Sequence, residues 1–135
     1  MKIRHSVQAV IIDENKKKFL LIKQFDKWKK RYLWRHVKGG IEKGENEKQA
    51  LRREIQEEVG LKDIEIIGKI HQYGYIFIPK KFSVSVYLVK ANMREKVVLV
   101  STEEDKIKDY RWVTRPQALK MLYWGDEKKP IKHFQ

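Results

Sequence analysis

One stretch of this sequence, VKGGIEKGENEKQALRREIQEEVGL, constrains the fold more than any other. Glycines gather at its start, and glutamates run through the rest, although the whole chain carries a formal net charge of +13. The apolar residues Leu51, Ile55 and Val59 recur every four positions, which predicts an amphipathic helix over Asn46 to Val59. The sequence therefore predicts a glycine-rich turn that leads into a helix with a buried apolar stripe.

Three glutamates of this helix share one face. Glu54, Glu57 and Glu58 fall at positions i, i+3 and i+4, and like charges at this spacing repel one another. A hard divalent cation removes that repulsion, and Mg²⁺ prefers carboxylate and phosphate oxygens as ligands. The helix alone is also compatible with a solvated acidic face that the neighbouring arginines neutralise. A metal site and a solvated face are thus both open from the helix by itself.

The spacing of the whole stretch is more specific. From Gly39 to Leu61 the chain reads GGIEKGENEKQALRREIQEEVGL. This resembles the Nudix box, G-x5-E-x7-R-E-U-x-E-E-x-G-U with U aliphatic, at every position. Seven fixed positions, each with a background frequency of about 7%, agree by chance about once in 10⁸ starts. The chain is therefore identified from its sequence as similar to the Nudix hydrolases.

The resemblance implies an α+β chain with the Nudix fold, an α/β/α sandwich around a mixed β-sheet. It also implies hydrolysis of a nucleoside diphosphate linked to another moiety. Glu54, Glu57 and Glu58 would be the principal ligands of Mg²⁺, with Mn²⁺ as a possible substitute. Arg53 would pair with a glutamate and orient it, and Glu45 would be a more peripheral member of the site. A metal-bound water would attack phosphorus.

Other residues of the stretch suit the same chemistry. Gly39 and Gly40 let the backbone approach a phosphate chain closely, and the helix N-terminus adds positive potential there. The proton acceptor would be a glutamate of the box or one of a later loop. In that loop we favour Glu104 over Glu103 and Asp105. A polar turn is the alternative reading of these three acidic residues.

The substrate is less constrained than the chemistry. The segment LWRHVKGGIEKGE resembles the W-x-x-P-K-G-x-x-E-x-G-E pattern of the dinucleoside-tetraphosphate hydrolase branch, with Val37 in place of proline. Lys38, next to the predicted helix, would contact a phosphate, and an ordinary surface lysine is the alternative. The segment IHQYGYIF places Tyr73 and Tyr75 on one face of a strand, where they would stack on an adenine. An ordinary half-buried strand is the alternative for these aromatic residues.

Residues 26–36, DKWKKRYLWRH, are basic and aromatic without a clean period, and we predict a loop. Trp28 among lysines is expected to be exposed and able to meet a base. Trp34 is expected to pack in the core. His36 is either a phosphate donor or an ordinary loop residue.

These residues predict a Mg²⁺-dependent hydrolase that cleaves a dinucleoside polyphosphate such as diadenosine tetraphosphate. The alternatives within the family are removal of pyrophosphate from RNA 5′ ends, which the positive charge suits, hydrolysis of oxidised nucleoside triphosphates, and hydrolysis of ADP-ribose. Inositol pyrophosphates are further candidate ligands for so basic a protein. A rival of a different class is a non-catalytic RNA-binding module on the Nudix fold, supported by residues 26–36.

The whole chain of 135 residues, 41% of them apolar, predicts a single domain over 1–135 with its own core. Its apolar runs are far shorter than the ~20 residues that span a bilayer, and it has no cysteine. We expect a cytoplasmic monomer or homodimer that does not associate with membranes. The remaining pattern predicts strands at 3–12, 19–23, 64–78, 83–90, 97–100 and 109–113, turns at 13–18, 38–45 and 78–82, a C-cap at Gly60, and a second and last helix from 114 to about 124.

Overall fold

The computed structural model describes residues 2–100, 102 and 106–132. Seven strands and three helices follow one another in these ranges. They are β1 (Ile3–Ile12), β2 (Phe19–Asp26), β3 (Arg31–Arg35), β4 (Val37–Gly40), α1 (Glu47–Val59), β5 (Ile64–Phe77), β6 (Lys80–Ala91), β7 (Ile107–Val113), α2 (Arg115–Met121) and α3 (Gly125–Lys132). None of the helices in the described ranges is long and apolar enough to cross a membrane.

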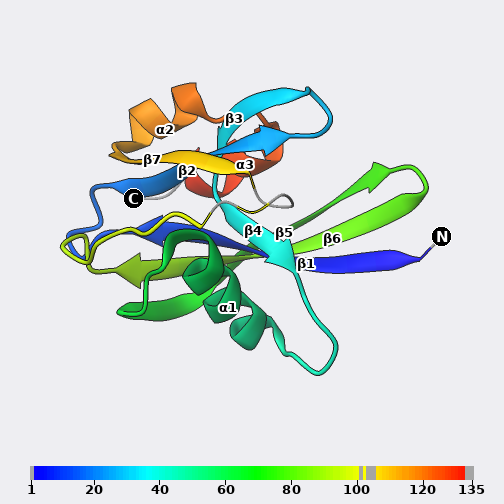
Figure 1. Cartoon of the computed structure of the whole chain (residues 1–135), viewed down its shortest axis with the longest axis horizontal. Coiled ribbons are helices and arrows are strands. Elements are labelled where there is room, and N and C mark those ends of the chain that lie inside the picture. Colours follow the sequence, from blue (N-terminus) through cyan, green and yellow to red (C-terminus); the bar gives the residue numbers. More distant parts are fainter. Residues whose placement is uncertain (1, 101, 103–105, 133–135) are drawn as a thin grey trace.

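One mixed sheet joins these seven strands (Figure 1). Its main order is β3-β2-β1-β6-β5, with β4 paired to β1 and β7 paired to β2. β1 runs parallel to β6 and antiparallel to β2 and β4. β1 therefore lies at the centre of the sheet, and residues 6–9 of β1 lie directly beside the glycine-rich strand β4.

Helices cover both faces of the sheet, and β1 contributes to both cores. Val7, Ala9 and Ile11 point into a core that contains the apolar stripe of α1. Val10 and Ile12 alternate with them and point into a second core, which α2 and α3 close. Figure 1 shows α1 on one side of the strands and α2 and α3 on the other. This arrangement confirms the predicted α/β/α sandwich around a mixed sheet.

Both ends of α1 are capped. Asn46 is the N-cap, and its side chain accepts a hydrogen bond from the backbone N–H of Gln49 at 2.8 Å. The Gln49 side chain accepts one from the Asn46 backbone N–H at 2.9 Å, which completes a capping box. Gly60 caps the other end with a φ of 70°, a left-handed conformation that glycine adopts without steric cost. The predicted helix is thus present, with Asn46 preceding its first turn.

The prediction of a loop over residues 26–36 is wrong in its second half, which forms β3. Tyr32 and Trp34 lie opposite Phe25 and Lys23 of β2 in an antiparallel pairing. Side chains on both faces of β3 are partly buried, and this removes the alternation that would reveal a half-exposed strand. Residues 38–40, predicted as part of a turn, likewise belong to a strand, β4.

Residues 97–100 do not form the predicted strand. The backbone N–H of Val98 donates to the Val59 carbonyl at 2.9 Å, and that of Val100 donates to the Glu58 carbonyl at 3.4 Å. These bonds satisfy carbonyls at the C-terminal end of α1, which have no partner within the helix. The segment therefore hydrogen-bonds to the end of α1 and is not a strand of the sheet.

The prediction of two helices is also wrong, because the described chain has a third, α3. Thr114 and Gln117 form a capping box at the start of α2, but α2 ends at Met121, short of the predicted end near residue 124. α3 contains Pro130, and an interior proline normally argues against a helix. β5 is one continuous strand that includes Gly68 and Gly74, with register shifts near Gly68.

Candidate active site

Arg53 links the glycine-rich loop to α1. Its Nε and Nη2 donate to the two carboxylate oxygens of Glu45 at 2.7 and 2.9 Å. Nη2 also donates to the Gly40 carbonyl at 2.8 Å, and Nη1 donates to Glu54 at 2.8 Å and to Glu57 at 3.2 Å. The hydrogen bonds to Glu45 and Glu54 raise the pKa of Arg53 above its ordinary value, so the guanidinium stays charged.

Glu45 is the main partner of this arginine. Besides the two bonds from Arg53, its Oε1 accepts a hydrogen bond from the Glu42 backbone N–H at 2.9 Å. The bonds from Arg53 and from the Glu42 backbone hold the pKa of Glu45 below its ordinary value. Glu45 therefore fixes the loop against the helix, a structural role that the sequence pattern did not reveal.

Glu54 and Glu58 are buried, and Glu57 is exposed. The exposed fractions of Glu54 and Glu58 are only 7% and 1%. Burial raises the pKa of Glu54 above its ordinary value, although hydrogen bonds with Glu58 and Arg53 act in the opposite direction. Two buried carboxylates one helical turn apart need a proton or a cation to relieve their repulsion. This donor set of carboxylate oxygens suits a hard divalent cation.

The three predicted ligands are not assembled around one point. In the part of the chain that the structure describes, no three Asp, Glu, His or Cys side chains lie close enough together to hold an ion. The carboxylate of Glu57 pairs with Arg53 at 3.2 Å, while Glu54 accepts a hydrogen bond from Arg53 at 2.8 Å and Glu58 is buried one helical turn after it. Binding of one cation by all three would therefore require Glu57 to turn away from Arg53.

The close packing of β4 on α1 makes a glycine necessary at one position of the loop. A β-carbon at Gly39 would overlap the carboxylate of Glu54. A β-carbon at Gly40 would meet nothing within 4 Å. Gly39 is thus required for the position of a candidate ligand, whereas the predicted phosphate contacts of both glycines stay predictions.

Lys38 lies with two tyrosines of β5. Its Nζ donates to the Tyr75 hydroxyl at 3.2 Å and lies 4.9 Å from the centre of that ring. The rings of Tyr73 and Tyr75 are stacked with centres 6.3 Å apart, and the Tyr73 hydroxyl donates to Oε1 of Gln8 at 2.6 Å. The structure therefore brings together the residues predicted to bind substrate, and their contact with a substrate remains a prediction.

Arg35 is a cation of this region that the sequence analysis did not single out. Burial would lower its pKa, but Glu127 of α3 and Glu58 of α1 hold that pKa above its ordinary value. Burial, and then the charge of Arg35, lower the pKa of Lys38 to about 8. Two neighbouring cations beside tyrosine hydroxyls suit a phosphate chain. The position of Arg35 within the LWRHVKGG segment is the only signal that could have pointed to it.

The pKa of Lys38 gives the site a measurable pH dependence. The ammonium form predominates below about pH 8 and the neutral amine above it, so binding of an anionic substrate should weaken as pH rises through that value. We expect KM to rise about tenfold between about pH 7 and about pH 9. Lys38→Arg keeps its charge over this range and should show no such rise. Steady-state KM values for both proteins across this range test the assignment, and parallel profiles would contradict it.

Two further candidates lie elsewhere. His36 is fully buried; its backbone N–H donates to Oε1 of Glu127 at 2.9 Å, and its ring Nε2 lies 3.0 Å from the Glu127 carbonyl oxygen. It therefore holds the junction of β3 and β4 against α3, and it is not a phosphate donor. Glu104, together with Glu103 and Asp105, lies outside the described residues, and its role as the proton acceptor stays a prediction.

The family model of the NUDIX domain matches residues 2–134. The chain belongs to the Nudix family. Its Nudix relatives include the RNA pyrophosphohydrolase of Nitratiruptor, which is 37% identical over 90 residues, covering 59% of this chain and 57% of that protein. The RNA pyrophosphohydrolase of Campylobacter jejuni is 27% identical over 115 residues, covering 76% of this chain and 74% of that protein.

The solved structures agree with this assignment. A C. elegans Ap4A hydrolase in a binary complex superposes on the Nudix chain with a TM-score of 0.82, at 24% identity, over 97% of this chain and 94% of that one. This likeness establishes the fold. The predicted class, a Nudix pyrophosphohydrolase, is confirmed at the level of the family, whose members generally use divalent metal ions.

Proposed function

We propose that this protein is a Mg²⁺-dependent Nudix hydrolase that removes pyrophosphate from RNA 5′ ends in the cytoplasm. The observation that carries the chemistry is the pair of buried carboxylates, Glu54 and Glu58, beneath a loop fixed by Arg53. The choice of RNA is supported by the relatives named RNA pyrophosphohydrolase and by the net charge of +13, which favours a polyanion.

The glutamates of α1 would bind the metal ion, and Arg53 would position one of them. Glu54, Glu57 and Glu58 would hold the cation, and Arg53 would keep Glu54 in position through the hydrogen bond at 2.8 Å. Bound Mg²⁺ supplies positive charge for the phosphate oxygens and lowers the pKa of a coordinated water. A glutamate of the box, or Glu104, would accept the proton of the attacking water.

Lys38 and Arg35 would bind the phosphate chain. Their two positive charges lie on either side of the junction between β3 and β4, and the Tyr75 hydroxyl is a further polar group beside them. Gly39 leaves space for the Glu54 carboxylate, so that the loop backbone and the candidate ligand stay close together. Lys38, Arg35 and the backbone at Gly39 would together position the anhydride bond over α1.

A dinucleoside polyphosphate such as diadenosine tetraphosphate is the second candidate substrate. The specific support is the row formed by Lys38, Tyr75 and Tyr73, in which a cation lies next to two stacked rings. A phosphate on Lys38 and an adenine on the tyrosines would use all three side chains. The enzyme would act on either substrate as a monomer or homodimer.

A substrate panel tests the proposal. The purified protein is given Mg²⁺ and, in separate assays, a 5′-triphosphorylated RNA oligonucleotide, diadenosine tetraphosphate, an oxidised nucleoside triphosphate and ADP-ribose. We expect pyrophosphate release from the RNA with the highest kcat/KM, and no turnover when the metal is removed with EDTA. A higher kcat/KM for the dinucleotide would favour the second candidate. Absence of turnover on every substrate would contradict both and leave the non-catalytic RNA-binding module.

A further inference from the structure

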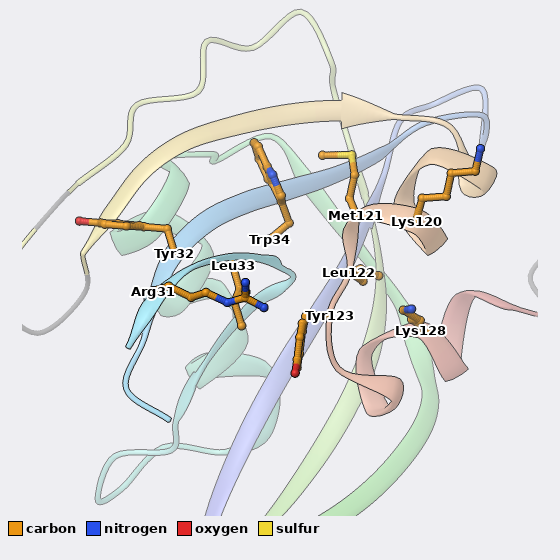
Figure 2. Close-up of a pocket in the computed structure, with 9 residues that line it drawn as sticks. All are labelled: Arg31, Tyr32, Leu33, Trp34, Lys120, Met121, Leu122, Tyr123 and Lys128. Atoms are coloured by element: carbon orange, nitrogen blue, oxygen red, sulfur yellow. The ribbon is translucent and has the colours of Figure 1, made fainter. Parts of the chain in front are cut away.

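Apart from Arg35, the basic and aromatic side chains of β3 take no part in the active site described above. Within the described residues, β3 pairs with β2 along one edge, and its other edge makes a single bridge, between Trp34 and Leu122. A groove of about 480 Å³ follows this edge. Figure 2 shows its lining, which comes from β3, from the end of α2 and the two residues that follow it, and from Lys128 of α3.

Cations lie over the aromatic rings of the first wall, formed by β3. Lys23 and Arg111 lie 5.8 and 5.3 Å from the centre of the Trp34 ring. Lys108 lies 4.0 Å from the centre of the Tyr32 ring. The three cations come from β2, which pairs with β3, and from β7, which pairs with β2. Rings with cations beside them on an open sheet are a suitable surface for stacked bases and their phosphates.

The second wall has the same composition. Arg31 and Lys29 lie 5.3 and 5.2 Å from the centre of the Tyr123 ring, which is 39% exposed. Lys120 and Lys128 also line the groove, and no described residue that lines it is acidic. Of these cations, Arg31, Lys120 and Lys128 line the groove, and Lys23, Lys29, Lys108 and Arg111 lie over its aromatic rings. None of the seven forms an ion pair with a carboxylate of the described residues. The positive charge of the groove is therefore available to an anionic ligand.

We propose that this groove binds the single-stranded body of an RNA whose 5′ end occupies the active site. Bases would stack on the rings of Tyr32 and Tyr123, and the surrounding lysines and arginines would neutralise phosphates. An acidic peptide would use the cations but would leave the rings without a role, so the observations favour RNA. The choice of RNA rests on the proposed function, and it extends that function to a second contact surface.

The chain itself places the groove within reach of the active site. β3 continues through His36 directly into β4, so Trp34 and Lys38 are four residues apart in sequence. Four residues of extended chain span at most about 14 Å. An RNA with its 5′ phosphates at Lys38 therefore needs only a few nucleotides to reach Trp34.

Binding without catalysis gives the first test. The probe is a fluorescent single-stranded RNA with a 5′-hydroxyl, followed by anisotropy in the absence of Mg²⁺. Tyr32→Ala is expected to weaken binding about tenfold, whereas Tyr32→Phe, which keeps the ring, should bind as the wild type does. Lys108→Gln should reduce the slope of log affinity against log salt by about 0.7.

Matched controls come from exposed residues outside the groove. Tyr110→Ala removes a tyrosine of β7 that is 37% exposed, and Lys90→Gln removes a lysine that pairs with Glu65. Both controls are expected to bind RNA as the wild type does. Equal affinities of Tyr32→Ala and Tyr110→Ala would overturn the proposal. Binding of poly-glutamate that is lost in Lys108→Gln but kept in Tyr32→Ala would assign the groove to acidic peptides and would also overturn it.

Measurements of RNA hydrolysis distinguish a failure of the groove proposal from a failure of the proposed function. With 5′-triphosphorylated RNA, Tyr32→Ala should raise KM about tenfold at unchanged kcat, and it should leave dinucleotide hydrolysis unchanged. RNA hydrolysis with the same KM in Tyr32→Ala and Tyr110→Ala would refute the groove and leave the enzyme assignment intact. RNA that binds through Tyr32 but is never hydrolysed would refute the enzyme assignment and leave the groove intact.

Discussion

Gly39→Ala is expected to lower kcat/KM about 100-fold, because displacement of a reacting geometry by about 1 Å has an effect of this size. A β-carbon at Gly39 would overlap the Glu54 carboxylate, so that side chain must leave its position between Arg53 and Glu58. Neither the backbone of β4 nor the fold of α1 has to change for this to happen. The loss should therefore appear in activity and in metal affinity, with little change in the unfolding temperature.

Gly40→Ala is the matched control for this prediction. The two glycines are neighbours in β4, and neither has a positive φ, so alanine suits the backbone at both positions. A β-carbon at Gly40 meets nothing within 4 Å. We expect kcat/KM of Gly40→Ala to stay close to that of the wild type. Steady-state kinetics on the preferred substrate measures both variants, and equal losses would show that Glu54 does not depend on the space at Gly39.

Arg53→Ala is expected to lower kcat about 10- to 100-fold, the usual range for residues that orient metal ligands. Removal of the guanidinium takes away both hydrogen bonds to Glu45, one to Glu54 and the one to the Gly40 carbonyl. The segment from Gly40 to Glu45 then loses the side chain that links it to α1. Titration of the protein with Mn²⁺, followed by electron paramagnetic resonance, should show weaker metal binding alongside the slower turnover.

The neighbouring Arg52 supplies the control. It lies on the same helix, is exposed, and takes no part in the bonds that join α1 to the loop. Arg52→Ala should turn over substrate at the wild-type rate. Arg53→Lys should not restore activity, because one ammonium group cannot bind both oxygens of Glu45 in the geometry of a guanidinium fork. Full activity of Arg53→Lys would mean that only the charge at this position matters.

The helix and the position of its candidate metal-binding glutamates could be predicted because their signals are local. Leu51 and Ile55 set the buried stripe, and Asn46 and Gly60 set the ends, all within a few residues of the elements they define. The alternation of β1 is equally local. A single sequence is sufficient to predict such elements. It was also sufficient to find the Nudix box, and the resemblance to that family predicted the fold.

The remaining features depend on residues far apart in the chain. Lys38 meets Tyr75 only because β4 and β5 lie in one sheet, and no local pattern records that contact. β3 escaped prediction because both of its faces are partly buried, and α3 because of Pro130. The helical spacing does not determine whether the Glu57 side chain points toward Arg53 or toward a cation shared with Glu54 and Glu58. In the structure it pairs with Arg53.

Through the contact between Glu127 and His36, α3 supports the chain beside Arg35 and Lys38, the residues proposed to bind phosphate. α3 contributes no ligand to the glutamate site, yet it fixes the bend at which the chain passes from β3 to β4. Lys38 follows that bend by two residues, whereas the candidate metal ligands stand on α1. Substitutions that destabilise the packing of α3 should therefore weaken phosphate binding more than they lower the rate of hydrolysis.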